Sequence, residues 1–280
     1  MEKKAIIFDI ARSSFVDGPG IRTTVFFKGC NLRCAWCHNP ESWKAETELM
    51  FYRDKCTACG ACLRNCPNDL KSCDFCGRCE HYCPNDARRI CGKEYTAKEI
   101  FDEVARDKIF YDTSGGGATF SGGECMLYPD FLCDVLALCK DNGIHTAVDT
   151  AGNVPWESFL KVLPYTDLFL YDIKLMDSDL HKKYTGVSNE LILQNLAKLL
   201  NCGANVFIRV PIIAGINDSA SEMQKIKAFF DEHGCPQKIE LLPYHKLGES
   251  KAHAIGKEPV LFDAPGKEKM DELNKIFEDM

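Results

Sequence analysis

Apolar residues recur along most of the chain with two different spacings, and their alternation predicts the secondary structure. Six short runs rich in β-branched and aromatic residues predict buried strands at residues 22–28, 118–121, 144–149, 168–173, 205–211 and 238–242. Helical spacing of apolar residues predicts helices at 96–107, 129–142, 155–163, 178–184, 188–201, 219–233 and 267–278. The first helix opens with Thr96 and Glu99, which match a capping box.

Strands that alternate with helices predict parallel pairing through right-handed crossovers. Six strands are two fewer than a closed eight-stranded barrel requires, so we expect an α/β fold, an open partial (β/α)6 TIM-like barrel. In such folds the chemistry lies at the carboxyl ends of the strands. The polar motifs described below all follow strands directly.

The alternation stops between residues 50 and 92, where cysteines, Pro-Asn pairs and short polar steps leave no room for regular elements. This segment predicts a small insertion supported by metal. The barrel would then comprise residues 1–49 and 93–280.

The composition is that of an ordinary soluble globule, with 45% hydrophobic and 27% charged residues. A net charge of −7 argues against nucleic acid as the main partner, because phosphate binding needs a basic surface. No stretch has the length of a membrane span, and the apolar run at the start is too short for a signal peptide. We therefore expect a cytoplasmic protein without a membrane partner.

Seventeen cysteines are the unusual feature of the composition. An odd number in a long chain without an export signal indicates metal binding rather than disulfides. Eleven of them form three compact groups between Cys30 and Cys83. The others are expected to be small buried thiols: Cys91, Cys125, Cys133, Cys139, Cys202 and Cys235.

The first group has the spacing Cys-x3-Cys-x2-Cys, with Cys30, Cys34 and Cys37 on one loop after a strand. A 4Fe–4S cluster held only by protein needs four thiolates. Three thiolates would leave one iron open for a small-molecule chelator. The alternative is a zinc site or a redox-neutral loop, but zinc usually closes with a regularly spaced fourth ligand, and His38 directly adjoins Cys37.

The other two groups each repeat the bacterial ferredoxin spacing, followed by proline. In that arrangement the fourth cysteine of each group crosses to the other cluster. One cluster would use Cys56, Cys59, Cys62 and Cys83, and the other Cys73, Cys76, Cys79 and Cys66. Six residues between Cys66 and Cys73 make a shorter linker than ferredoxins usually have. A two-zinc module is the alternative.

Segments 15–22 (FVDGPGIR) and 27–30 (FKGC), together with the three-cysteine group, carry a family resemblance. Almost from end to end, the chain resembles a glycyl radical enzyme activating enzyme of the radical S-adenosylmethionine superfamily, similar to pyruvate formate-lyase activating enzyme. Many members carry a ferredoxin-like insertion after the first cluster. The resemblance makes Cys30, Cys34 and Cys37 the ligands of the catalytic cluster.

Gly122, Gly123 and Glu124 follow the second predicted strand. Adjacent glycines at a strand end let backbone groups approach a ligand, and an acceptor there can hold an ammonium group. The resemblance implies that this ammonium belongs to the methionine part of S-adenosylmethionine. A phosphate-binding loop is the rival interpretation, but no Gly-Lys-Ser/Thr follows.

Charged and polar residues end the next strands, where solvated strand ends are the alternative explanation. The resemblance implies that Lys174 pairs with the methionine carboxylate. It also implies that Asp149, Thr150 and Asp172 bind a monovalent cation. Hard oxygen ligands suit such an ion. The remaining cofactor-binding residues implied by the resemblance are Trp36, His38, Ile173, Arg209 and His245.

The implied reaction is reductive cleavage of S-adenosylmethionine to a 5′-deoxyadenosyl radical, which takes a hydrogen atom from a glycine of a partner glycyl radical enzyme. Flavodoxin or ferredoxin would donate the electron. The two insertion clusters would relay electrons or dock the partner. The alternatives are a radical enzyme acting directly on a small molecule or peptide, and a non-catalytic electron carrier.

Overall fold

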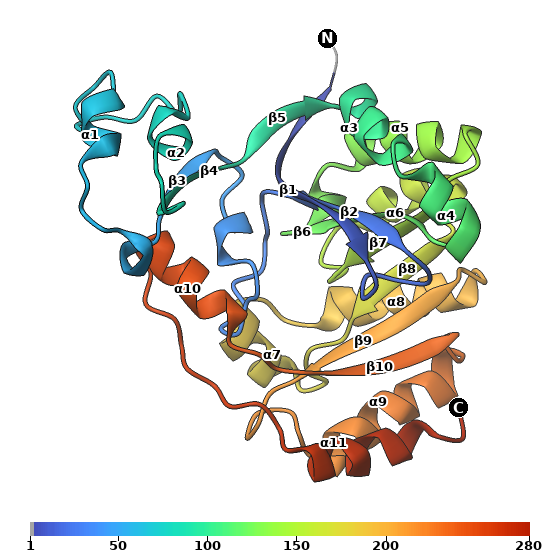
Figure 1. Cartoon of the computed structure of the whole chain (residues 1–280). Helices are drawn as coiled ribbons and strands as arrows, with labels where there is room; N and C mark the ends of the chain where they lie inside the picture. The colour runs from blue at the N-terminus through green and yellow to red at the C-terminus, as the bar shows by residue number, and fades with distance from the viewer. Residues whose placement is uncertain (1–2) are drawn as a thin grey trace.

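A computed structural model describes residues 3–280 and contains a sheet of eight strands. All six predicted strands are present, pair in parallel and follow one another across the sheet. They are β2 (Arg22–Phe27), β6 (Gly117–Gly122), β7 (His145–Thr150), β8 (Leu168–Asp172), β9 (Val206–Ile212) and β10 (Lys238–Pro243). The partial-barrel fold predicted from the alternation is confirmed (Figure 1).

The seven predicted helices are also present, and most of them lie outside the curved sheet (Figure 1). The capping box of the first helix is confirmed, because Thr96 Oγ1 accepts from the Glu99 amide at 3.2 Å and Glu99 accepts from the Thr96 amide at 2.8 Å. The helices are α3 (Ala97–Ala105), α5 (Pro129–Asp141), α6 (Trp156–Val162), α7 (Ser178–Thr185), α8 (Glu190–Asn201), α9 (Ala220–His233) and α11 (Lys267–Asn274).

The structure adds elements that the pattern did not predict. Strands β1 (Lys4–Ser14) and β5 (Lys93–Thr96) extend the sheet beyond β2 in antiparallel pairs. Register shifts interrupt the pairing of β1 with β2, so its alternation of buried and exposed residues is irregular. Two short helices, α4 (Lys108–Ser114) and α10 (Leu247–Ala254), were also missed.

The expectation that residues 50–92 contain no regular elements is wrong. Strands β3 (Glu48–Phe51) and β4 (Arg88–Cys91) form an antiparallel ladder, and between them lie α1 (Ala61–Asn65) and α2 (Arg78–His81). Helices of five and four residues are too short to show a helical period. Figure 1 shows α1 and α2 set apart from the barrel, with β3 and β4 connecting them to it.

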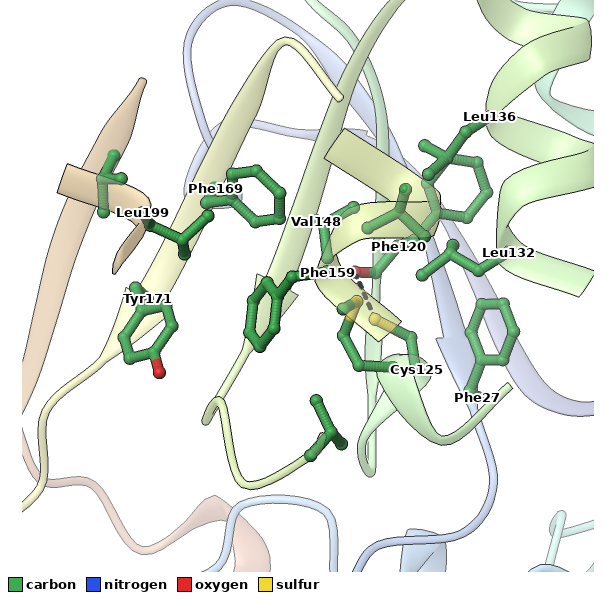
Figure 2. Close-up of a cluster of buried hydrophobic side chains, with 14 of the residues drawn as sticks. Phe27, Phe120, Cys125, Leu132, Leu136, Val148, Phe159, Phe169, Tyr171 and Leu199 are labelled. Atoms are coloured by element: carbon green, nitrogen blue, oxygen red, sulfur yellow. Dashed lines mark hydrogen bonds between the residues drawn. The ribbon is translucent and has the colours of Figure 1, made fainter. Parts of the chain in front are cut away.

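The main core lies between the sheet and its helices (Figure 2). Phe27, Phe120 and Phe169 from the strands pack with Leu132 of α5 and Phe159 of α6, and all are buried. Each such side chain contributes roughly 1.5–3 kcal/mol by leaving water. This packing fixes the strand ends on which the site is built.

The scattered cysteines only partly follow their predicted burial. Cys91, Cys125 and Cys139 are buried, and the Cys125 thiol donates to the Phe120 carbonyl at 3.3 Å (Figure 2). Cys202 and Cys235 are exposed, which contradicts the expectation. Both follow the last turn of a helix, where the chain turns back toward the next strand.

Candidate active site

The three-cysteine group lies on a closed loop at the carboxyl end of β2. The Gly29 amide donates to the Ser42 carbonyl at 2.7 Å, and the Cys30 amide donates to the Trp43 carbonyl at 3.3 Å. These bonds tie the ends of the loop together. Cys30, Cys34 and Cys37 stand between them as free thiols.

The two glycines after β6 hold this loop close to the sheet. The Gly123 amide donates to the Phe27 carbonyl, and the Glu124 amide donates to the Gly29 carbonyl, both at 2.8 Å. A Cβ atom on Gly123 would lie 2.3 Å from the Gly29 carbonyl oxygen, and Gly122 has a φ of +115°. In this structure the close approach that the glycines permit is to the cysteine loop.

Glu124 joins the ends of β6 and β7 from inside the protein. Its carboxylate accepts from the Thr150 hydroxyl at 2.8 Å, the Ala151 amide at 3.0 Å and the Met126 amide at 3.1 Å. Burial raises the pKa of Glu124 to about 7. Its contact with a methionine ammonium group stays a prediction.

A ring of charged side chains faces the mouth of the barrel beside the cysteine loop. Arg209 of β9 lies 3.6 Å from Asp149 of β7, 3.7 Å from Asp172 of β8 and 4.0 Å from Asp17. Lys174 Nζ donates to Asp172 at 2.8 Å. The structure therefore brings together four residues predicted separately, and adds Asp17. The signal that could have found Asp17 was its place in the 15–22 signature.

The charges in this ring do not balance, because Lys174 and Arg209 face three carboxylates. Burial raises the pKa of Asp149 to about 6, against the opposing effect of Arg209. Burial opposes the positive charges of Lys174 and Arg209, but the neighbouring carboxylates raise the pKa of both. Two buried guanidinium nitrogens, Nε and Nη1 of Arg209, have no hydrogen-bond partner within residues 3–280.

The predicted cation ligands have protein partners. Asp149 accepts from Ser121 at 2.5 Å, while the Thr150 hydroxyl donates to Glu124. Across the described residues, no three His, Cys, Asp or Glu side chains form a group that could hold a single metal ion. Ile173 is buried, and its amide donates to the Arg209 carbonyl at 3.0 Å.

Aromatic side chains line the other side of the cysteine loop. His38 Nε2 and His245 Nδ1 share a hydrogen bond of 2.5 Å. Burial, together with the nearby His245, lowers the pKa of His38 to about 4. Trp36 is buried against Tyr184 and Phe262. His38 of this loop and His245, which follows β10, therefore meet.

The insertion cysteines line two hollows. One hollow of about 150 Å³ is lined by the four thiols of the crossed ferredoxin assignment, Cys56, Cys59, Cys62 and Cys83. The other, of about 610 Å³, is lined by Cys66 and Cys76, whereas Cys73 and Cys79 lie outside its lining. The structure thus gathers one predicted set completely and the other in part.

Comparison with known proteins agrees with this fold. The family model of the radical SAM superfamily matches residues 62–226, a span that begins after the three-cysteine loop. The SuiB structure from Streptococcus suis with bound S-adenosylmethionine shares the fold, at 15% identity and a TM-score of 0.57 over 89% of this chain and 44% of that one. Fold and family model together define a radical SAM protein.

More similar relatives cover most or nearly all of the chain. The trans-4-hydroxy-L-proline dehydratase activating enzyme of Clostridioides difficile is 44% identical over 98% of this chain and 96% of its own. The choline trimethylamine-lyase activating enzyme of Oleidesulfovibrio alaskensis is 41% identical over 94% and 93%. A domain structure of a pyruvate-formate lyase-activating enzyme from Bacteroides vulgatus is 34% identical, with a TM-score of 0.51 over 59% of this chain and 94% of that one.

The chain belongs to the glycyl radical enzyme activating enzymes of the radical SAM superfamily. It is therefore an enzyme that activates a glycyl radical enzyme through a radical derived from S-adenosylmethionine. Membership implies a 4Fe–4S cluster and S-adenosylmethionine as its cofactors. No helix within residues 3–280 is long and apolar enough to cross a membrane.

Proposed function

We propose that Cys30, Cys34 and Cys37 hold the catalytic cluster and that the charged ring beside them binds S-adenosylmethionine. The observation that carries this proposal is the position of three free thiols on a closed loop next to Lys174, Asp172, Asp149 and Arg209. When bound, the cluster supplies the one-electron reductive cleavage of S-adenosylmethionine.

The thiols suit a metal that displaces protons. Burial raises the pKa of both Cys30 and Cys37 to about 12, so these thiols are neutral without metal. Burial also raises the pKa of Cys34, while Lys174 acts in the opposite direction. Because ligands bind iron as thiolates, cluster assembly releases protons, and the nearby Lys174 charge favours that release.

The charged ring fits a ligand with one net positive charge. S-adenosylmethionine carries a sulfonium, an ammonium and a carboxylate, which leaves a single positive charge, and the ring has one excess carboxylate. Lys174 would pair with the ligand carboxylate. Glu124 would accept from the ammonium group, because its three hydrogen bonds leave one of the roughly four acceptor sites of an ionised carboxylate.

A monovalent cation at Asp149, Thr150 and Asp172 is part of the same proposal. The chemistry of the donors supports it, because two carboxylates and a hydroxyl offer the hard oxygen atoms that such an ion prefers. His38, His245 and Trp36 would form the wall on the other side of the ligand. Gly122, Gly123 and Ile173 would keep the strand ends and the cysteine loop in register.

We also propose two further 4Fe–4S clusters, in residues 50–92, with the crossed ligand assignment. The hollow lined by Cys56, Cys59, Cys62 and Cys83 supports it for one cluster, and the pair Cys66 and Cys76 supports it for the other. Flavodoxin or ferredoxin is the proposed electron donor, and the cytoplasm is the proposed location.

Anaerobically reconstituted protein, reduced with dithionite in the presence of S-adenosylmethionine, tests the first proposal. The wild type should form 5′-deoxyadenosine, and Cys34→Ala should form at least about 100-fold less, because loss of a metal ligand typically removes the bound cofactor. Cys202→Ser is the control, since Cys202 is exposed at the end of α8. Undiminished 5′-deoxyadenosine in the Cys34 variant would contradict the assignment.

A further inference from the structure

Lys28 is a buried charged residue that the proposed chemistry leaves unused. It follows β2 directly, precedes the cysteine loop and has 0% of its surface exposed. A buried ammonium group is costly unless it is paired and hydrogen-bonded. Its partners therefore indicate what the residue is for.

Three separate segments meet at the Lys28 ammonium group. Nζ donates to the Glu41 carbonyl at 2.6 Å and to Glu48 Oε2 at 3.1 Å, and it lies 3.9 Å from Cys91 Sγ. Glu41 belongs to the end of the cysteine loop, Glu48 begins β3, and Cys91 ends β4. Both strands through which the chain enters and leaves the 50–92 insertion thus contact one ammonium group.

The protonation states of Glu48 and Cys91 favour contacts with a charged lysine. Burial opposes ionisation of Glu48, but hydrogen bonds from Lys44 and Lys28 lower its pKa overall, so it pairs as a carboxylate. Burial raises the pKa of Cys91 to about 11, so its sulfur stays neutral beside the lysine. A paired carboxylate and two neutral acceptors satisfy the three donors of the ammonium group.

The stem of Lys28 is fixed as well. Gly92, which follows β4, packs against this stem. A Cβ atom at that position would lie 2.6 Å from Lys28 Cδ, and the φ of +104° there also favours glycine. The Lys28 amide donates to the Ile6 carbonyl at 2.8 Å, and its carbonyl accepts from the Tyr128 hydroxyl at 2.9 Å. The residue is therefore anchored in the sheet while its side chain holds the insertion.

We propose that Lys28 is a positioning residue that fixes the orientation of the insertion against the cysteine loop. The functional meaning rests on the proposed clusters of the insertion, because electron transfer between clusters depends steeply on their separation. Removing the ammonium group would break the contacts through which both connecting strands and the end of the cysteine loop meet.

Hydrogen exchange of the full chain tests the positioning. In Lys28→Met, amides of 48–51 and 88–91 should exchange about tenfold faster, because local opening of the ladder becomes easier. Lys44→Met is the matched control, since Lys44 also pairs with Glu48, at 2.8 Å, but is exposed and reaches neither Glu41 nor Cys91. Amides of β7 to β9 should be unchanged in both variants.

Unchanged exchange in the ladder of Lys28→Met, or equal acceleration in all strands, would overturn the proposal. If that variant does not fold, Glu48→Gln replaces it, with faster exchange expected in β3 and in its ladder partner β4. In reconstituted protein, pulsed electron paramagnetic resonance measures the distribution of distances between reduced clusters. This distribution should be broader in Lys28→Met than in the wild type and unchanged in Lys44→Met. Absence of 5′-deoxyadenosine from wild-type protein would instead contradict the proposed function, while the exchange result would still decide the role of Lys28.

Discussion

Glu124 is buried and Arg209 is partly buried at the mouth of the barrel, and their environments differ. Glu124 accepts three hydrogen bonds from the protein. Arg209 faces three carboxylates at 3.6–4.0 Å and keeps two nitrogens without partners in the described part of the chain. A buried donor without an acceptor costs about 1–3 kcal/mol. A ligand that supplied acceptors at Arg209 would therefore gain affinity. The hydrogen bonds of Glu124, in contrast, hold the ends of β6 and β7 together.

The raised pKa of Glu124 predicts how stability depends on pH. In the folded protein its pKa is about 7, so between about pH 4.5 and 7 the folded state holds a proton that the unfolded state has released. The free energy of unfolding should therefore fall as pH rises, by about 2 kcal/mol from pH 5 to 7 for this group. Denaturant unfolding of metal-free protein at both pH values measures the change.

Glu124→Gln should reduce this pH dependence. A smaller fall should remain, because the raised pKa of Asp149 acts in the same direction. An identical pH dependence in the wild type and in Glu124→Gln would show that Glu124 does not hold the proton.

At the scale of elements, the end of β6 determines where the cysteine loop sits. Gly123→Ala would place a methyl group 2.3 Å from the Gly29 carbonyl oxygen, so the loop must move away from the sheet. We expect the amount of iron held at the three-cysteine loop to fall several-fold. The free energy of unfolding should fall by about 1–3 kcal/mol, as for other overpacked positions. Iron analysis and thermal unfolding measure the two effects.

Gly266→Ala is the control for this element, because its Cβ atom would have nothing within 4 Å and its φ needs no glycine. If Gly123→Ala bound as much iron as Gly266→Ala, the end of β6 would not be needed to position the loop.

The elements that sequence reasoning missed share a physical cause. β1 is interrupted by register shifts, and α1 and α2 are shorter than one and a half helical turns. α10 has a polar sequence and packs on the cysteine loop, where Gly248 would place a Cβ atom 2.3 Å from the Cys37 carbonyl. Their positions depend on tertiary contacts rather than on a repeating pattern.

At the scale of the whole molecule, a barrel and a cysteine-rich insertion share one chain. The crossed ligand assignment predicts that Cys83→Ser weakens the cluster of Cys56, Cys59 and Cys62. In reconstituted protein these three thiols should become accessible to an alkylating reagent, while Cys73, Cys76 and Cys79 stay protected. Mass spectrometry of the alkylated peptides gives the pattern.

The reverse pattern in Cys83→Ser, with alkylation of Cys73, Cys76 and Cys79, would replace the crossed assignment with an uncrossed one. Cys235→Ser is the control, because this cysteine is exposed in the turn after α9.

The sequence by itself determined the six parallel strands, the capping box at Thr96 and the three-cysteine loop, because periodicity and ligand spacing are local properties of the chain. Only the tertiary structure decided that Arg209 stands between Asp17, Asp149 and Asp172, and that Lys28 joins Glu41, Glu48 and Cys91. These contacts join residues far apart in the chain. They depend on how the sheet curves and where the insertion returns to it, and no local pattern carries that information.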